Sequence, residues 1–175
     1  PVFTGNEYGL MGLGADPNYA QNKRLFLYYT PNDNSKENRL SQFTYDDAKD
    51  TLVFASEKVV LRVQVKKDGC CHTGGSIDFD GKGNLFLSTG DDTNPFESDG
   101  YGPMDGRPGR SGFDARYTSS NTNDLRGKIL RIKVQPDGTY TIPEGNMYLA
   151  STAKTRPEIF VMGCRNPYRI SVDKH

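Results

Sequence analysis

The sequence predicts an all-β fold of short antiparallel strands, and three observations carry this prediction. The 175 residues include 19 Gly and 10 Pro, the residues that most often form turns between strands. There are 10 Tyr and 9 Phe, many of them in short runs that also hold Val, Ile and Leu. No stretch has the apolar spacing of an amphipathic helix. We therefore expect strands joined by turns.

The expected strands follow one another in pairs. The first two are separated by the polar loop 31–38. Further along, the Gly/Asp/Asn turn at 80–84 joins two short runs in the manner of a β-hairpin. The strand-like runs are residues 24–29, 39–45, 58–65, 76–79, 85–88, 128–133, 139–141, 158–162 and 168–172.

A weak internal repeat groups these strands into units. The runs 24–28 and 84–88 are similar, and each follows a turn that begins with Asp. Such repetition is typical of β-propeller blades of ~40–60 residues, so we interpret residues 1–175 as a partial β-propeller domain of about three blades. Propellers need at least about four blades, so we expect a piece of something longer. The remainder of the propeller or another chain would complete the fold.

An insertion from about residue 91 to 126 is the longest segment without a strand pattern. Long ordered loops in compact domains are often functional. Calcium binds several carboxylate and carbonyl oxygens on flexible loops, and the candidate ligands here are Asp91, Asp92, Asn94 and Asp99. The alternative is a lid in which arginines of the same segment neutralise these acids by ion pairing.

The charge balance argues against two classes of partner. The 22 Lys and Arg residues equal the 22 Asp and Glu residues, whereas nucleic-acid-binding domains carry an excess of positive charge. No window approaches the roughly 18 consecutive apolar residues of a membrane-spanning helix. We therefore expect no nucleic-acid partner and no membrane span.

Two strings carry candidate chemistry. His72 lies between adjacent cysteines and a Gly pair at the start of a strand, and a histidine, with an unperturbed pKa of about 6.5, suits a general base near neutral pH. Arg165 and Asn166 follow another strand and offer donors suited to an anionic, polar ligand. The alternatives are a turn-capping histidine and a structural arginine that binds loop carbonyls.

A family resemblance appears when the strings are taken together. They are EYGLMG (7–12), DPNY (16–19), HTGG (72–75), NLFLSTGD (84–91), LRGKILRI (125–132) and RPEI through GCRNP (156–167). In this order they resemble the soluble glucose/sorbosone dehydrogenase family, six-bladed β-propellers that use pyrroloquinoline quinone (PQQ). The resemblance spans nearly the whole chain.

The resemblance implies a function. His72 matches the catalytic base that takes a proton from a sugar hydroxyl while hydride passes to the quinone, and Arg165 and Asn166 match residues that contact it. Glu7 falls where the family has a Gln or Glu lining the site. The implied activity is PQQ-dependent oxidation of a sugar or a sugar-derived alcohol or aldehyde, with Ca²⁺ as a further cofactor and a periplasmic or extracellular location. The chain by itself is expected to be inactive, because other cofactor contacts of the family lie beyond it.

The sequence also departs from the family pattern. Well-studied glucose dehydrogenases have an acidic residue before the catalytic histidine, and here Cys71 occupies that position. Some similar propellers bind no quinone, so the alternative function is a non-catalytic module that binds carbohydrate or protein or serves in assembly.

The family alignment also suggests a disulfide. It places Cys71 and Cys164 at neighbouring blade entrances, so we expect Cys164 to be bonded to Cys71 or Cys70. A Cys70–Cys71 bridge and three unpaired buried thiols are the alternatives.

Overall fold

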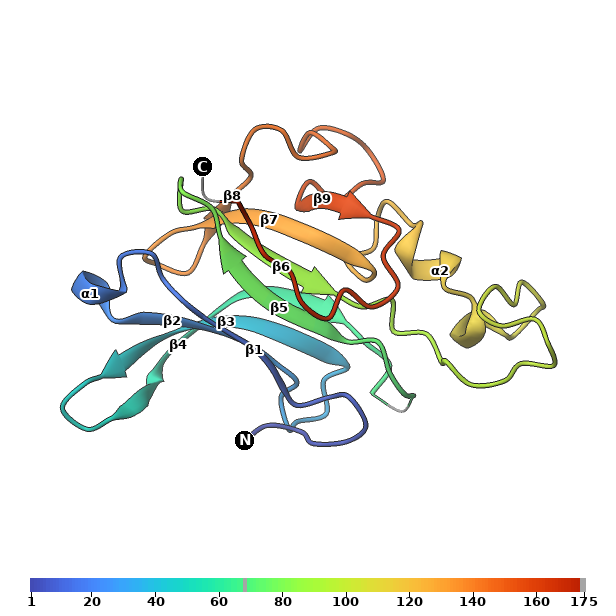
Figure 1. The fold of residues 1–175 in the computed structure, drawn as a ribbon, viewed down its shortest axis with the longest axis horizontal. Helices are drawn as coiled ribbons and strands as arrows, with labels where there is room; N and C mark the ends of the chain where they lie inside the picture. The colour runs from blue at the N-terminus through green and yellow to red at the C-terminus, as the bar shows by residue number, and fades with distance from the viewer. Residues whose placement is uncertain (68, 174–175) are drawn as a thin grey trace.

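Two antiparallel sheets lie side by side in the computed structural model, which describes residues 1–67 and 69–173 (Figure 1). The first sheet is a meander of β1 (Leu10–Ala15), β2 (Arg24–Tyr29), β3 (Glu37–Asp46) and β4 (Thr51–Gln64). The second has the order β5 (Gly74–Phe79), β6 (Leu85–Thr89), β7 (Lys128–Val134) and β8 (Tyr140–Thr141), and β9 (Ile159–Met162) also pairs with β7. Short helical turns lie in the connections: α1 (Tyr19–Asn22), η1 (Ser111–Phe113) and α2 (Arg116–Ser119).

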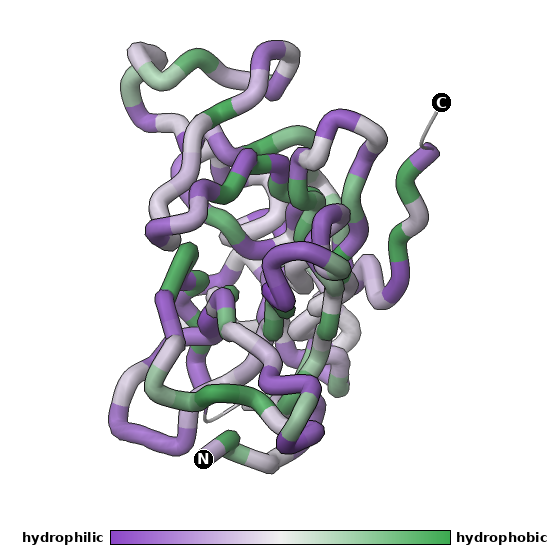
Figure 2. Tube along the Cα trace, turned by 90° about the vertical axis from the view of Figure 1, so that its left-hand side faces the viewer, coloured by the Kyte–Doolittle hydropathy of each residue, from purple (hydrophilic) through white to green (hydrophobic). Residues whose placement is uncertain are grey.

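The hydrophobic core lies between the two sheets. Phe26 and Tyr28 of β2 are two residues apart, so both side chains point to the same face of the strand and are buried there. The second sheet contributes Leu85, Leu87 and Leu130, all almost fully buried. Figure 2 shows short apolar segments alternating with polar segments along the chain. The side-chain period of the strands therefore sets which residues form the core.

The backbones of the two sheets touch where β1 meets β5. A Cβ atom on Gly12 would lie 1.8 Å from the carbonyl oxygen of Gly75, and one on Gly14 would lie 2.7 Å from Cγ2 of Ile77. Any side chain at these positions would push the sheets apart. Glycine is a poor strand former, so packing between the sheets, rather than local propensity, accounts for β1.

The observed strands match most of the expected runs, and the mismatches have physical causes. The sequence pattern missed β1 because of its glycines, and β4 begins at Thr51 rather than at residue 58. The strand expected at 168–172 is wrong. This segment is not in a sheet, because its amides bond side chains of β5: Ile170 N donates to Ser76 Oγ and Val172 N to Asp78 Oδ2.

The all-β prediction is confirmed by the two sheets and by helices of only three or four residues. Two sheets occupy the length on which we expected about three blades, because β4 spans 14 residues and the connection from β6 to β7 takes up 90–127. That connection projects from one side of the molecule and contains α2 (Figure 1). In the described part of the chain, no helix has the length and apolarity to cross a membrane.

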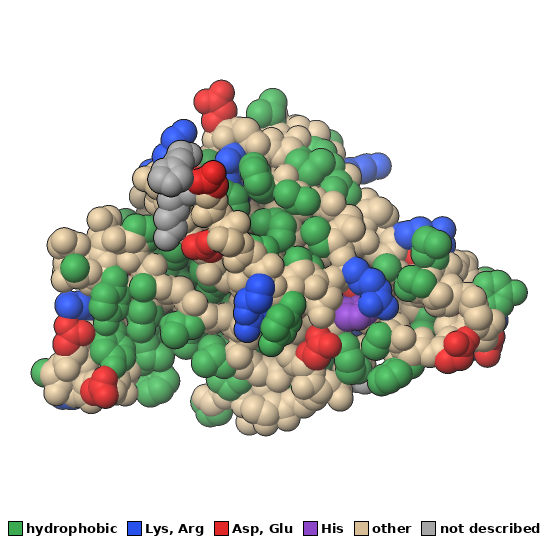
Figure 3. Space-filling model, viewed as in Figure 1, with side chains coloured by type: hydrophobic (Ala, Val, Ile, Leu, Met, Phe, Trp, Pro, Cys, Tyr) green, Lys and Arg blue, Asp and Glu red, His purple; other side chains and the backbone are tan. Residues whose placement is uncertain are grey.

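The outer face of the first sheet is apolar and exposed. Leu13 and Phe54 expose 62% and 74% of their surfaces. Leu27, Tyr29 and Phe43 contribute to the lining of an open groove of about 510 Å³ on this sheet. Hydrophobic side chains gather over the β3–β4 end of the sheet (Figure 3). Apolar patches of this kind mark contact surfaces.

Candidate active site

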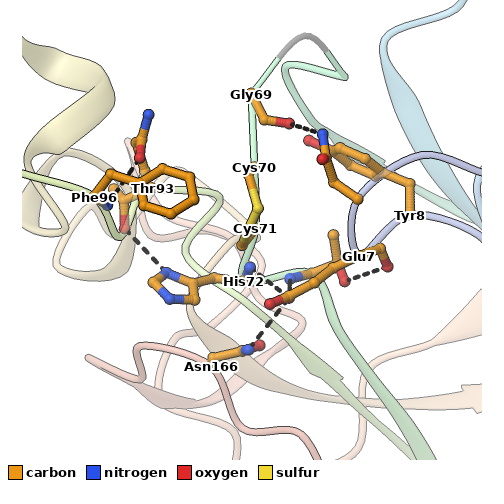
Figure 4. The surroundings of a disulfide bond; sticks show 12 residues. Glu7, Tyr8, Gly69, Cys70, Cys71, His72, Thr93, Phe96 and Asn166 are labelled. Carbon is orange, nitrogen blue, oxygen red and sulfur yellow. Dashed lines mark hydrogen bonds between the residues drawn. A yellow bond between two sulfur atoms is a disulfide. The ribbon is translucent and has the colours of Figure 1, made fainter.

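Loops from both sheets bring the expected site residues together. Glu7 precedes β1, His72 lies just before β5, and Arg165 and Asn166 follow β9. Asn166 Oδ1 accepts a hydrogen bond from the Gly74 amide at 3.0 Å, which ties the last of these loops to the first strand of the second sheet. In Figure 4 the Glu7 side chain reaches the backbone of His72 and the side chain of Asn166, while the His72 ring points to the other side, toward Thr93. Residues far apart in the sequence thus form one cluster.

Backbone contacts hold the His72 loop in an unusual conformation. His72 has φ +60° and Cys71 has φ +149°, both in the left-handed region that favours glycine. Glu7 Oε2 accepts a hydrogen bond from the His72 amide at 2.6 Å, and the His72 carbonyl accepts one from the Asp92 amide at 3.1 Å. A Cβ atom on Gly90 would lie 1.8 Å from the His72 carbonyl oxygen, so only glycine permits this approach.

The His72 ring has a partner on each nitrogen. Nδ1 lies 2.9 Å from Asp91 Oδ1, and Nε2 lies 3.0 Å from Arg165 Nη1. A guanidinium can only donate, so Nε2 must accept, and a carboxylate can only accept, so Nδ1 must donate. These partners assign a neutral imidazole with its proton on Nδ1 and a lone pair on Nε2. This is the form in which histidine acts as a general base.

Asp91 is the functional residue whose role the sequence analysis missed. Its side chain is completely buried, Oδ1 also accepts the Thr93 amide at 3.0 Å, and Oδ2 has no hydrogen-bond partner among the described residues. We expected it to bind metal, yet it orients the His72 ring. An acid therefore contacts the His72 ring from just after β6, although Cys71 occupies the position before His72. One feature of the sequence pointed to Asp91 as a site residue: it is the last residue of the family-like string 84–91.

Arg165 and Asn166 present polar groups beside the base. Arg165 is exposed although its guanidinium reaches His72. Among the described residues, Asn166 Nδ2 has one long contact of 3.4 Å, to Glu7 Oε2. A small hollow of about 150 Å³ separates Arg165 from Phe96 and Pro103 of the 90–127 connection. Arg165 and Asn166 both donate hydrogen bonds, so a ligand with carbonyl or carboxylate oxygens would offer them suitable acceptors.

The expected calcium site is not formed. Among the residues that the structure describes, no group of three or more His, Cys, Asp or Glu side chains could hold a metal ion. Asp91 bonds His72, and Asn94 Oδ1 accepts the Phe96 amide. Asp99 pairs with arginines at 107 and 110.

Asp92, the remaining candidate calcium ligand, is also engaged elsewhere. Its two oxygens bind the Tyr8 hydroxyl at 2.8 Å and Arg126 Nη1 at 3.1 Å. Burial raises the pKa of this carboxyl, while Tyr8 and Arg126 act in the opposite direction. The structure therefore supports the alternative, in which arginines neutralise the acids of the insertion.

The expected disulfide to Cys164 is wrong. Cys70 and Cys71 are bonded to each other, and Cys164 has a free thiol whose pKa is raised by burial. The backbone of Cys164 is held in place by a hydrogen bond, which its amide donates to the Gly127 carbonyl at 3.0 Å. The loop after β9 therefore approaches the His72 loop through Arg165 and Asn166, without a covalent link.

Comparisons with known proteins agree on one family. A family profile for glucose/sorbosone dehydrogenases matches residues 1–175. The chain is 29% identical over 184 residues to human Hedgehog-interacting protein and 26% identical over 174 residues to the aldose sugar dehydrogenase YliI of Escherichia coli. Each alignment covers 98% of this chain, but only 23% and 39% of those proteins.

The solved structures support the fold. The PQQ-bound aldose sugar dehydrogenase from Streptomyces coelicolor superposes with a TM-score of 0.62 at 27% identity, covering 94% of this chain and 39% of that one. The predicted class is confirmed: the two sheets are part of a β-propeller. The chain spans well under half the length of the relatives that it matches.

Proposed function

The chain belongs to the glucose/sorbosone dehydrogenase family, and on this premise we propose that it supplies the general base and part of the cofactor site of a PQQ-dependent dehydrogenase. The substrate class would be a sugar or a sugar-derived alcohol or aldehyde. The observation that carries the proposal is the His72 ring, held between Asp91 and Arg165 with its lone pair on Nε2.

The geometry supports proton abstraction by His72. A substrate hydroxyl near Nε2 would give its proton to the imidazole, and the buried Asp91 carboxylate would stabilise the resulting positive charge. Arg165 now occupies the acceptor side of Nε2, so it would have to turn away before a hydroxyl could approach. Its exposed position leaves it room to do so. Binding of a ligand to Arg165 would therefore free Nε2 to accept the proton of the substrate.

The donor set fits PQQ, a quinone with three carboxylates. Arg165 and Asn166 would hold oxygens of the cofactor, because a guanidinium and an amide both donate to carbonyl and carboxylate groups. Bound PQQ would supply the acceptor for the hydride that leaves the substrate carbon. Glu7 would act from the other side of the cluster by holding the backbone of His72 and the amide of Asn166.

The whole protein must contribute more than this chain does. The chain spans 39% of the Escherichia coli relative, and the first sheet exposes an apolar outer face. We therefore expect further blades, from the same or another chain, to cover that face and to complete the cofactor site. The chain alone would be inactive. A periplasmic or extracellular location is part of the proposal and depends on the family alone.

Replacing His72 by Gln in the full-length protein tests the proposal. Turnover measured by PQQ-dependent dye reduction should fall at least about 100-fold, because general base catalysis contributes that much or more. PQQ affinity measured by calorimetry should change only a few-fold. Unchanged turnover in the variant would show that His72 is not the base.

A non-catalytic binding module is the second candidate function, and the similarity to human Hedgehog-interacting protein favours it. The two functions differ in one requirement, because only the enzyme must bind PQQ. Calorimetric titration of the full-length protein with PQQ, in the presence of a divalent cation, separates them. Absence of binding would support the binding module.

A further inference from the structure

We propose that the disulfide between Cys70 and Cys71 is a positioning element for His72. This inference builds on the proposed function, since it assigns to the bond the task of holding the base in place. The bond immediately precedes His72 in the chain, and Cys71 is buried. In Figure 4 the two cysteines lie between Gly69 and His72, at the edge of the cluster.

The conformation of the loop gives the bond its role. Cys71 and His72 are consecutive residues other than glycine, and both have positive φ. L-residues avoid this region unless their surroundings enforce it. A bond between neighbouring cysteines closes a small ring around their shared peptide, which removes the extended conformations that the loop would otherwise favour. The disulfide thus restricts the backbone directly before the base.

Hydrogen bonds anchor the loop on both sides of the disulfide. On one side, Asn6 Nδ2 donates to the Gly69 carbonyl at 3.1 Å. On the other, Glu7 and Asp92 bind the amide and the carbonyl of His72. With its ends fixed in this way, the loop can change its path mainly at the two cysteines.

A change in the backbone path of this loop would displace the His72 ring. The ring meets Asp91 on one nitrogen and Arg165 on the other, at 2.9 and 3.0 Å. Both contacts depend on the direction of the Cα–Cβ bond, which the positive φ of His72 sets. If the loop relaxed toward negative φ, the ring could not keep both contacts. Misplacement of a catalytic group by about 1 Å can cost about 100-fold in rate.

Opening the bond is a two-electron reduction. A dithiol reductant would transfer two electrons and two protons to the two sulfur atoms, giving two thiols, and would itself become a disulfide. Cys164 does not take part, because it is a separate thiol whose pKa is raised by burial. It therefore provides the matched control.

The first test counts thiols and observes His72 without any need for activity. In the full-length protein without added cofactor, mass spectrometry of unreduced peptides should find Cys70 and Cys71 bonded and Cys164 free. Nitrogen NMR should show the Nδ1-protonated form of His72 in the oxidised protein. In C70S/C71S, or after treatment with a dithiol, the two nitrogen signals should move toward those of a mixture of tautomers. C164S should leave them unchanged.

The second test uses turnover. We expect C70S/C71S to lower kcat about 10- to 100-fold with PQQ affinity within a few-fold of the wild type. The variant C70S/C71G should recover part of the loss, because glycine adopts positive φ without strain. A purely structural role of the bond would lower protein stability but would not be rescued in kcat by glycine.

The outcomes separate this inference from the proposed function. Free thiols at Cys70 and Cys71 in the oxidised protein, or unchanged His72 signals in C70S/C71S, would overturn the inference. If C70S/C71S does not fold, dithiol treatment of the wild type gives the same readout. A protein that binds no PQQ would instead refute the proposed function, while the NMR comparison would still decide the role of the disulfide.

Discussion

The His72 ring shows at the scale of single residues how partners select a chemical form. Asp91 can only accept and Arg165 can only donate, so the two together set the tautomer of the imidazole. Asp91 is completely buried, so its charge is poorly screened and acts strongly on the nearby ring. The proposed function of His72 therefore depends on a residue 19 positions away in the sequence.

The Asp91→Asn variant should lose most of its turnover. The Asn amide can donate to Nδ1 and so favour the wrong tautomer, and it removes the charge that stabilises protonated His72, so we expect kcat to fall about 100- to 10,000-fold. PQQ affinity should change little. Steady-state dye reduction in the full-length protein measures the first quantity and calorimetry the second.

Asp99→Asn is the matched control, because Asp99 lies in the same connection but its carboxylate pairs with Arg107 and Arg110 rather than with His72. Its kcat should equal that of the wild type. An Asp91→Asn variant with more than half of the wild-type kcat would contradict the assigned role.

The connection between β6 and β7 is held to its sheet by a buried lysine. Lys128, the first residue of β7, is fully buried. Its Nζ donates to the carbonyls of Thr118, Ser119 and Arg126 at 2.8, 2.9 and 2.7 Å. One side chain thus binds the end of α2 and the return of the chain to the sheet. Asp91 lies at the start of this connection, so the contact helps to keep Asp91 next to the His72 loop.

The titration of Lys128 should appear in the stability of the protein. Burial lowers its pKa from 10.5 to about 8 in the folded state. Below pH 8 the lysine is charged in both states. Between pH 8 and 10.5 the folded state loses the proton while the unfolded state keeps it, so the free energy of unfolding should rise, by up to about 3 kcal/mol.

Chemical denaturation at several pH values measures this effect as the difference between the wild type and Lys128→Met. Subtracting the variant removes most of the contribution of Cys164, whose raised pKa acts in the opposite direction. Lys133 is exposed on the same strand, so the Lys133→Met variant should show the same rise in the free energy of unfolding as the wild type. A difference that does not change between pH 8 and 10.5 would rule out the buried titration.

At the scale of elements, local patterns predicted the strands that are rich in large apolar residues. They could not predict β1, whose glycines are needed only because β5 lies against it. They also assigned a strand to 168–172, where side chains of β5 take the amides instead. In both cases the deciding contact comes from another part of the chain.

At the scale of the whole molecule, close packing of two sheets sets the geometry of the site. The contact between Gly12 and Gly75 fixes the distance between β1 and β5. Glu7 lies just before β1 and His72 just before β5, so this distance also fixes how the two residues meet. Sheet packing and site geometry are therefore coupled.

Gly12→Ala should reveal this coupling. The added Cβ would overlap the carbonyl oxygen of Gly75, which belongs to the backbone and cannot rotate away, so we expect the free energy of unfolding to fall by about 3 kcal/mol. Gly112→Ala is the control, because its nearest neighbour would be Lys66 Nζ at 3.6 Å, an ordinary contact. Equal stability of the two variants, measured by urea denaturation, would show that the sheets can separate freely.

The sequence by itself determined the all-β class, most of the strands, the family, and the identity of His72, Arg165, Asn166 and Glu7 as candidates. These features depend on residue types and on their order along the chain, which the sequence states directly. Only the tertiary structure decided the role of Asp91, the bond between Cys70 and Cys71 and the ion pairs of the insertion. The contacts of Asp91 and Asp92 depend on which donors folding places beside buried carboxylates, and the disulfide depends on the path of the loop that holds Cys70 and Cys71.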